Sequence, residues 1–157
     1  MYVPEIDFLT AEDLPAILRI NANSEMSWPE EIIKSDLNDK SNNEITYIGA
    51  FALTTEAPLL GYAVLGREKR LGVLMALIVD KNFRRMKIAS QLLIAVSDCA
   101  MYLNFKRLML RVKKSNSPAI ALYSQMSFVQ EKIRQGYYSN GEDAIVMSAK
   151  LPLTLKL

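Results

Sequence analysis

The chain has 157 residues, half of them hydrophobic, and 19 Lys and Arg against 17 Asp and Glu give a formal net charge of +2. It contains no histidine and one cysteine, Cys99, which excludes a Ser-His-Asp triad, a histidine-ligated metal site and an internal disulfide. Acid–base chemistry must come from carboxylates, tyrosine, lysine, the cysteine, water or the substrate. Length and composition predict one domain over residues 1–157, and a cytoplasmic protein that binds neither DNA nor a membrane.

The first quarter of the chain predicts a strand and two helices. Loose alternation favours a strand over 3–9. Thr10, with a carboxylate three residues on, is a typical helix start, and apolar residues at helical spacing continue to Ala22. Pro29, followed by two glutamates, indicates a second, short helix that ends near Leu37.

Three strand-like segments follow, and their short links predict an antiparallel meander: 45–53, 59–67 and 72–80. The third segment is nearly all apolar. We therefore expect it to be central in the sheet and buried on both faces.

In the second half of the chain, the spacing of the apolar residues changes to that of a helix. From about Arg85, apolar residues at helical spacing predict a long amphipathic helix: Ile88, Leu92, Val96, Cys99 and Leu103. A strand over 108–112, a helix from Asn116 to Met126 and two strands over 128–133 and 144–149 complete the chain. The order βααβββαβαββ predicts an α/β (α+β) fold, with a mixed, mostly antiparallel central sheet flanked by helices.

Four cations lie where the third strand of the meander hands over to the long helix: Lys81, Arg84, Arg85 and Lys87. A helix N-terminus offers unpaired N–H groups and a positive dipole end to an anion. The small residues Ala89 and Ser90 would let a phosphate approach the backbone. The plainer interpretation is a solvated basic turn.

The segment Arg84-Arg85-Met86-Lys87-Ile88-Ala89 resembles the acetyl-CoA pyrophosphate loop of the GNAT superfamily of N-acetyltransferases, whose pattern is Gln/Arg-x-x-Gly-x-Gly/Ala. Lys87 stands where the first glycine is usual and adds a Cβ where the phosphate comes close. Residues 110–128 resemble the strand, the Asn-x-x-Ala-x-x-Leu-Tyr helix and the Gly-Phe signature of the same superfamily. Ser127 replaces the glycine before Phe128.

Residues 133–147, with the run Arg-x-x-Tyr-Tyr…Glu-Asp-Ala, resemble one branch in particular. That branch contains the ribosomal-protein alanine N-acetyltransferases (RimI type) and relatives that acetylate protein N-termini. The Ser27-Trp28-Pro29-Glu30 segment is similar to its Pro-Trp-Ser region, so the resemblance covers nearly the whole chain. It implies a GNAT fold, a metal-free transfer of acetyl from acetyl-CoA to an amine, and a monomer or weak dimer. The amine would be a protein N-terminal α-amine, such as that of a ribosomal protein.

The resemblance also implies residue roles. The backbone of Leu77, Ile78 and Val79 would pair with the pantetheine arm. Asn116 would hydrogen-bond the cofactor, and Tyr123, also at the cofactor, would be the general acid to the leaving thiolate. Trp28, Tyr137 and Tyr138 would flank the acceptor entrance. The pyrophosphate would lie against Arg84, Arg85, Met86, Lys87, Ile88, Ala89 and Ser90.

Each role has a structural alternative. Asn116 could be a simple helix cap, Tyr123 a core tyrosine, and the three aromatic residues a small core that pins two loops. The general base is open, because Arg111 stands where the branch carries a glutamate and arginine stays protonated. Asp80 is expected to face the phosphate end. A backbone-held water, either tyrosine of the 137–138 pair or a distant carboxylate acting through water remain as bases, while the arginine could instead hold an acidic group of the substrate or cofactor.

Two other functions fit the residues. One is a GNAT enzyme that acts on a small-molecule amine, such as a polyamine or an aminoglycoside; a strongly acidic cleft would favour it. The other is a non-catalytic module that binds acetyl-CoA or the ribosome, which the unusual Arg111 and Lys87 would fit.

Overall fold

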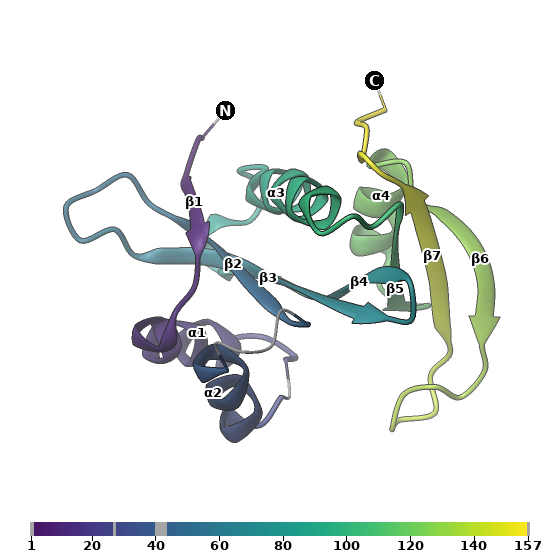
Figure 1. Ribbon diagram of the computed structural model, residues 1–157. Coiled ribbons are helices and arrows are strands. Elements are labelled where there is room, and N and C mark those ends of the chain that lie inside the picture. The colour runs from purple at the N-terminus through teal and green to yellow at the C-terminus, as the bar shows by residue number, and fades with distance from the viewer. Residues whose placement is uncertain (1, 27, 40–43, 157) are drawn as a thin grey trace. The chain divides into compact units, whose positions relative to one another are not determined.

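The computed structural model describes residues 2–26, 28–39 and 44–156, and these form seven strands in one sheet, in the order β1-β2-β3-β4-β5-β7-β6 (Figure 1). The strands are β1 (Glu5–Phe8), β2 (Thr46–Phe51), β3 (Leu59–Glu68), β4 (Leu71–Val79), β5 (Arg107–Lys113), β6 (Val129–Arg134) and β7 (Ala144–Lys150). The helices are α1 (Leu14–Asn21), α2 (Glu30–Asn38), α3 (Ile88–Tyr102) and α4 (Ser117–Gln125), with 3-10 turns η1 (Ala11–Asp13) and η2 (Lys81–Phe83). The predicted mixed, mostly antiparallel sheet flanked by helices is confirmed.

The chain forms two compact units, which we take in turn. The first unit is Met1–Gly66 with Ala76–Val96, and the second is Arg67–Met75 with Ser97–Leu157. The expectation of a single domain over 1–157 stays a prediction.

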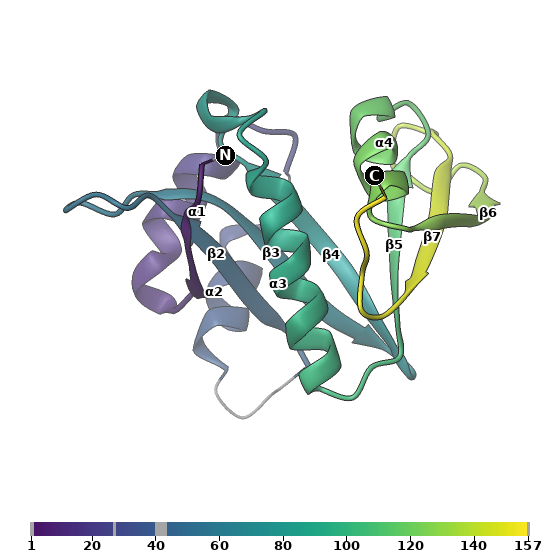
Figure 2. The ribbon, with the colours of Figure 1, turned by 90° about the horizontal axis from the view of Figure 1, so that it is seen from above.

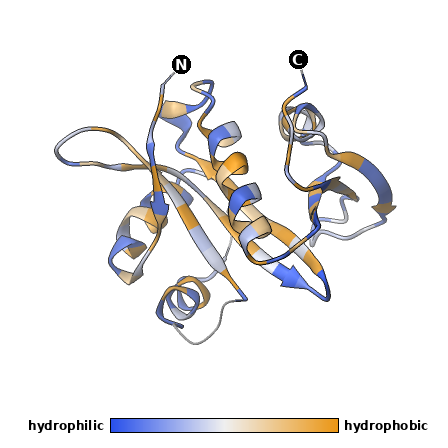
Figure 3. Ribbon diagram, turned by 45° about the horizontal axis from the view of Figure 1, so that its top comes forward, coloured by the Kyte–Doolittle hydropathy of each residue, from blue (hydrophilic) through white to orange (hydrophobic). Residues whose placement is uncertain are grey.

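In the first unit, α1 and α2 lie on one side of β2 and β3, and the first half of α3 lies on the other (Figures 1 and 2). Each helix carries both hydrophobic and hydrophilic residues, as an amphipathic helix on a sheet must (Figure 3). β3 is buried from Leu59 to Leu65, because it is covered on both faces. Around its Tyr62 packs a core of Leu9, Ile17, Ile20, Ile33, Tyr47, Leu59, Val64 and Ala76.

The start of α1 follows the predicted signal. The backbone N–H of Thr10 donates to the Asp13 carboxylate at 2.8 Å, and a 3-10 turn leads into the α-helix. The carboxylate thereby satisfies a donor that the helix itself cannot reach. The second predicted helix is α2, which begins after Pro29; Ser27 lies outside the described residues.

In the second unit, β7 pairs antiparallel with both β5 and β6, and the start of β4 pairs in parallel with β5. The parallel register covers Gly72, Val73 and Leu74 only, opposite Leu108 to Leu110. The helix α4 follows β5 and ends in a tight turn before β6. All six residues of the edge strand β6 are exposed.

Two predicted details are wrong. The long helix begins at Ile88 rather than near Arg85, because Arg85 and Lys87 have φ angles of 68° and 63°, which a right-handed helix cannot contain. The strand over 72–80 is not buried on both faces throughout. Met75 is 44 % exposed and Leu77–Val79 are half-buried, beyond the point where the ladder to β5 ends. In the described part of the chain, no helix is both long and apolar enough to span a membrane.

Candidate functional site

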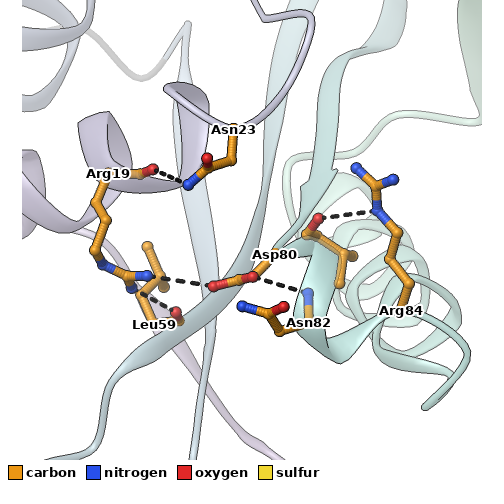
Figure 4. A network of polar contacts seen from close by, with 7 residues as sticks. Arg19, Asn23, Leu59, Asp80, Asn82 and Arg84 are labelled. Atoms are coloured by element: carbon orange, nitrogen blue, oxygen red, sulfur yellow. Dashed lines mark hydrogen bonds and ion pairs between the residues drawn. The ribbon is translucent and has the colours of Figure 1, made fainter.

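The junction after β4, in the first unit, is fixed by the carboxylate of Asp80 (Figure 4). This carboxylate accepts hydrogen bonds from the backbone N–H of Asn82 at 3.0 Å and from the Arg19 guanidinium of α1 at 3.2 Å. Arg19 also donates to the Leu59 carbonyl at 3.1 Å. The Asp80 carboxylate thus anchors the end of β4 to α1 and caps the start of η2. Nothing in the sequence indicated its pairing with Arg19.

The loop from Arg84 into α3 presents donors without acceptors. Among the described residues, the backbone N–H groups of Lys87, Ile88, Ala89 and Ser90 have no hydrogen-bond partner. The first three of the helix are the donors that any helix leaves unpaired. The loop reaches this geometry through positive φ at Lys87, so the lysine adopts the backbone conformation that glycine usually supplies. This arrangement has the N–H array and positive dipole end that an anionic group requires.

The charges around this loop also suit an anionic ligand. The side chains of Lys81, Arg84, Arg85 and Lys87 are exposed. The Arg84 Nε donates to the Val79 carbonyl at 3.4 Å, which holds that side chain against the end of β4. Within the described residues no carboxylate pairs with Arg85 or Lys87. Exposed like charges next to unpaired N–H groups favour a phosphate over a solvated turn.

The adjoining backbone at the end of β4 is close to β3. A Cβ on Gly61 would lie 2.8 Å from the carbonyl oxygen of Ile78, so only glycine allows this approach. Leu77, Ile78 and Val79 are half-buried here. The structure brings these three predicted residues and the loop from Arg84 to Ser90 together in the first unit.

In the second unit, Asn116 begins α4. Its side-chain oxygen accepts from the Ala119 N–H at 3.3 Å, so the predicted helix cap is present. The side chain is exposed, and its amide Nδ2 has no partner among the described residues. Capping and ligand binding are therefore compatible, because they use different atoms.

Tyr123 lies on the inner side of α4. It is 8 % exposed and its ring meets Phe128 edge-on, with 5.7 Å between ring centroids. Burial raises the pKa of Tyr123 to about 12, so the phenol keeps its proton at neutral pH. Its hydroxyl has no hydrogen-bond partner in the part of the chain that the structure describes. The ring is thus a core element and the hydroxyl an available donor.

The backbone around Tyr123 is closed by an αL cap. Ser127 has a φ of 73°, and the Phe128 N–H donates to the Tyr123 carbonyl at 3.0 Å. The Ser127 N–H donates to the Ser124 carbonyl at 3.2 Å, which completes a Schellman motif with serine at the usual glycine position. The Ser127 hydroxyl also donates to the carbonyl of Thr154 in the C-terminal segment at 2.7 Å.

A tyrosine–arginine cluster brings together side chains from the end of β3, from β5, from the end of β6 and from the loop after it; we define it as Glu68, Arg111, Arg134, Tyr137 and Tyr138. Arg111 binds Glu68 through both terminal nitrogens, at 2.7 and 2.8 Å. The Tyr137 ring has Arg111 at 5.8 Å and Arg134 at 5.6 Å from its centroid, and meets Tyr138 edge-on at 5.1 Å. Arg111 stands where the resembled branch carries a glutamate, and in this structure it forms an ion pair with Glu68.

The third predicted aromatic residue, Trp28, behaves differently. It is half-buried and packs against the core of the first unit beside Met26. By contrast, Tyr137 is 44 % exposed. Trp28 thus belongs to the main core of the first unit, whereas Tyr137 presents an accessible ring, and the role of each at the acceptor entrance stays a prediction.

Sequence reasoning missed Glu68 and Arg134. Glu68 lies 43 residues before Arg111, at the exposed end of a strand, and no local pattern links them. Arg134 was part of the Arg-x-x-Tyr-Tyr run, but its position over the Tyr137 ring depends on the turn after β6. Among the described residues, no group of three His, Cys, Asp or Glu side chains could hold a metal ion.

Residues 14–128 match the acetyltransferase (GNAT) family, so the chain belongs to this family of acetyltransferases. Over 154 residues it is 29 % identical to a [Ribosomal protein bS18]-alanine N-acetyltransferase of Escherichia coli, with 96 % of this chain and 98 % of that protein covered. A crystal structure of an E. coli enzyme of that kind has a TM-score of 0.80 at 25 % identity and covers 99 % of this chain and 96 % of its own.

Two further similarities are informative. An N-alpha-acetyltransferase of Saccharolobus solfataricus is 39 % identical over 83 residues, which are 52 % of this chain and about half of that protein, 50 %. The Arabidopsis thaliana NAA60 structure in complex with acetyl-CoA has a TM-score of 0.81 at 18 % identity and covers 94 % of this chain and 98 % of its own. The second similarity concerns the fold alone.

Proposed function

We propose that this protein transfers the acetyl group of acetyl-CoA to the α-amine of a protein N-terminus, with a ribosomal protein as one plausible class of acceptor. The observation that carries the proposal is the array of unpaired N–H groups from Lys87 to Ser90 among exposed cations. It fits the pyrophosphate of coenzyme A in number of donors and in charge. The names of the relatives in E. coli and S. solfataricus support an N-terminal acceptor.

Cofactor binding would use both backbone groups and side chains. The N–H array and the guanidinium groups of Arg84 and Arg85 would hold the pyrophosphate, and the backbone of Leu77–Val79 would pair with the pantetheine amides. The free Nδ2 of Asn116 would donate to the cofactor while its oxygen caps α4. Bound in this way, acetyl-CoA supplies an activated acyl group, and the protein positions it.

Tyr123 would act on the leaving sulfur. The new C–N bond forms as the C–S bond breaks, so nitrogen must lose one proton and sulfur must gain one. A phenol of pKa about 12 keeps its proton until negative charge develops on sulfur, and then donates a hydrogen bond to it. A thiol has a pKa of about 8.5, so full transfer from this phenol would cost roughly 5 kcal/mol. Tyr123 therefore stabilises the departing thiolate as a hydrogen-bond donor and keeps its own proton, while the proton that sulfur gains from water balances the one that nitrogen loses to water.

In the second unit, Glu68 is a weakened base. Glu68 is held by Arg111, whose hydrogen bonds lower the pKa of the carboxyl below its usual value. An α-amine needs little help: with a pKa of about 8, roughly a quarter is neutral at about pH 7.5. A lysine amine with a pKa of about 10.4 is roughly 0.1 % neutral there. This difference favours a protein N-terminus over lysine or a polyamine.

The test is an acetyl-transfer assay with purified protein, acetyl-CoA and three acceptors: an Ala-initiated peptide, the same peptide with a blocked N-terminus and one internal lysine, and spermidine. We expect acetyl on the free N-terminus, located by mass spectrometry, and released thiol in equal amount. Transfer to spermidine alone would favour the small-molecule alternative. Cofactor binding without transfer to any acceptor would favour the non-catalytic one.

A matched pair of variants tests the loop. Ala89→Glu puts a carboxylate into the first turn of α3, among the unpaired N–H groups. Ile94→Glu adds the same charge on an exposed position of the same helix. We expect acetyl-CoA to raise the thermal midpoint of the wild type and of Ile94→Glu, but not of Ala89→Glu. Equal shifts in all three would contradict the assignment of the loop.

A further inference from the structure

Two guanidinium groups face one tyrosine in the second unit. The Arg111 and Arg134 side chains lie 5.8 and 5.6 Å from the centroid of the Tyr137 ring. Each guanidinium carries a full positive charge, and an aromatic ring stabilises a neighbouring cation only modestly. The single carboxylate of the cluster, Glu68, binds Arg111, and its lowered pKa reflects first the Arg111 hydrogen bonds and, less strongly, the field of Arg134. The cluster therefore keeps one positive charge in excess.

Both guanidinium groups have unused donors. The Nε of Arg111 is buried and has no hydrogen-bond partner in the described part of the chain. Arg134 has neither an ion pair nor a side-chain hydrogen bond within the described residues. A buried donor without a partner costs free energy that a ligand oxygen would recover.

The carboxylates of the hairpin that carries the two tyrosines accept backbone N–H groups. Glu142 accepts the backbone N–H of Ser115 at 2.8 Å, and Asp143 accepts that of Gly136 at 2.9 Å. A third cation, Lys113, has its Nζ 5.5 Å from the centroid of the Tyr138 ring. Lys113, next to the half-buried Tyr138, thus also lies in the field of Glu142. The exposed Tyr137 ring remains next to Arg111 and Arg134.

We propose that this tyrosine–arginine cluster binds an acidic side chain of the acceptor peptide, downstream of the amine that is acetylated. The carboxylate would bind Arg134 and the Nε of Arg111, and the stem of that side chain would lie on the exposed Tyr137 ring. The inference rests on the proposed function and narrows its substrate class to N-termini followed by Asp or Glu. A polycationic acceptor would be repelled by the same groups.

The test uses three sets of Ala-initiated peptides, with Glu, Gln or Lys at position 2, 3 or 4. At one of these positions we expect kcat/KM for the Glu peptide to exceed that for the Gln peptide about fivefold, and the Lys peptide to be poorest. The charge reversal Arg134→Glu is expected to make the Lys peptide better than the Glu peptide. A gain on one substrate cannot come from misfolding.

Lys132→Glu is the matched control, because it makes the same charge change on the same exposed strand without a contact to the tyrosine pair. It is expected to keep the preference for Glu. Peptides that are acetylated equally whatever their charge would overturn this inference and leave the proposed function standing. Absence of transfer to every peptide would overturn both. Loss of RNA-oligonucleotide binding in Arg134→Glu, with no change in peptide preference, would assign the cluster to nucleic acid instead.

Discussion

Among the residues other than glycine that have a positive φ, Lys87 in the first unit and Ser127 in the second make an instructive pair. Lys87 ends the loop into α3 with φ 63°, and Ser127 follows α4 with φ 73°. Each conformation costs about 1 kcal/mol or more for a residue with a Cβ. Around Ser127 the cost is offset by two backbone bonds of a Schellman motif and by the hydroxyl bond to Thr154. Lys87 has exposed surroundings and adjacent N–H groups without partners.

Ser127 and Lys87 use the same left-handed backbone conformation for two different purposes. At Ser127 the protein satisfies the strained turn internally, and the turn fixes the backbone of Tyr123 through the Phe128 N–H. At Lys87 the donors are left unsatisfied, which is the arrangement that a ligand completes. Variants at and near these positions therefore test a positioning element against a binding element.

The largest effect is expected for Tyr123→Phe. Phenylalanine keeps the edge-on contact with Phe128 but removes the hydroxyl donor. We expect kcat to fall about 100-fold, the range for loss of an acid group, with little change in the acetyl-CoA shift of the thermal midpoint. An unchanged kcat would remove Tyr123 from the chemistry and leave Ser127 with a purely structural role.

The Ser127 turn is tested by a pair of substitutions. Ser127→Ala keeps the strained φ and loses the hydroxyl bond to Thr154, so we expect the free energy of unfolding to fall by about 1 kcal/mol. Ser127→Gly loses the same bond but relieves the strain, so its change should be near zero. Urea unfolding measures both. A glycine variant as unstable as the alanine variant would show that strain is negligible there.

The same pair at Lys87 should behave differently. Lys87→Gly is expected to raise the free energy of unfolding by about 0.5 kcal/mol in the absence of cofactor, because relief of strain exceeds the added freedom of the unfolded chain. Lys87→Ala keeps the φ and should be neutral. If the glycine variant were destabilised, the lysine side chain would have a packing role that its exposure does not indicate.

The smallest effect concerns Glu68. Its pKa is lowered by Arg111, so its contribution to stability is present above the pKa of the unfolded chain and is lost as pH falls through the lower folded value. Glu68→Gln should therefore cost about 0.5 kcal/mol at neutral pH, a value suited to a half-exposed pair, and the difference from wild type should shrink as pH falls below about 4.3 and vanish once the folded carboxyl is protonated. Unfolding at several pH values checks this. A difference independent of pH would rule out the ion pair as its source.

The order of elements could be read from the sequence, because helical and strand periods leave distinct patterns. Thr10 with its carboxylate and the Asn116 cap mark helix starts through local hydrogen bonding, and Pro29 marks one through its fixed φ and missing N–H; the structure confirms these starts. The resemblance of 84–89 and of 110–128 to GNAT motifs also identified the family, because those motifs record local backbone requirements. The boundary of α3 was placed too early, since nothing in the residues Arg85 and Lys87 announces a left-handed backbone.

Contacts between distant strands lay beyond the sequence. Glu68 and Arg111 meet because the end of β3 and the middle of β5 belong to one sheet, which no local period encodes. The same holds for Asp80, which Arg19 of α1 holds, and for burial along β4, which depends on where its ladder ends. The absence of histidine limited the available chemistry from the start. Only the tertiary structure decided that Arg111 pairs with Glu68 and that burial raises the pKa of Tyr123, because charge pairing and desolvation depend on neighbours that the fold assembles.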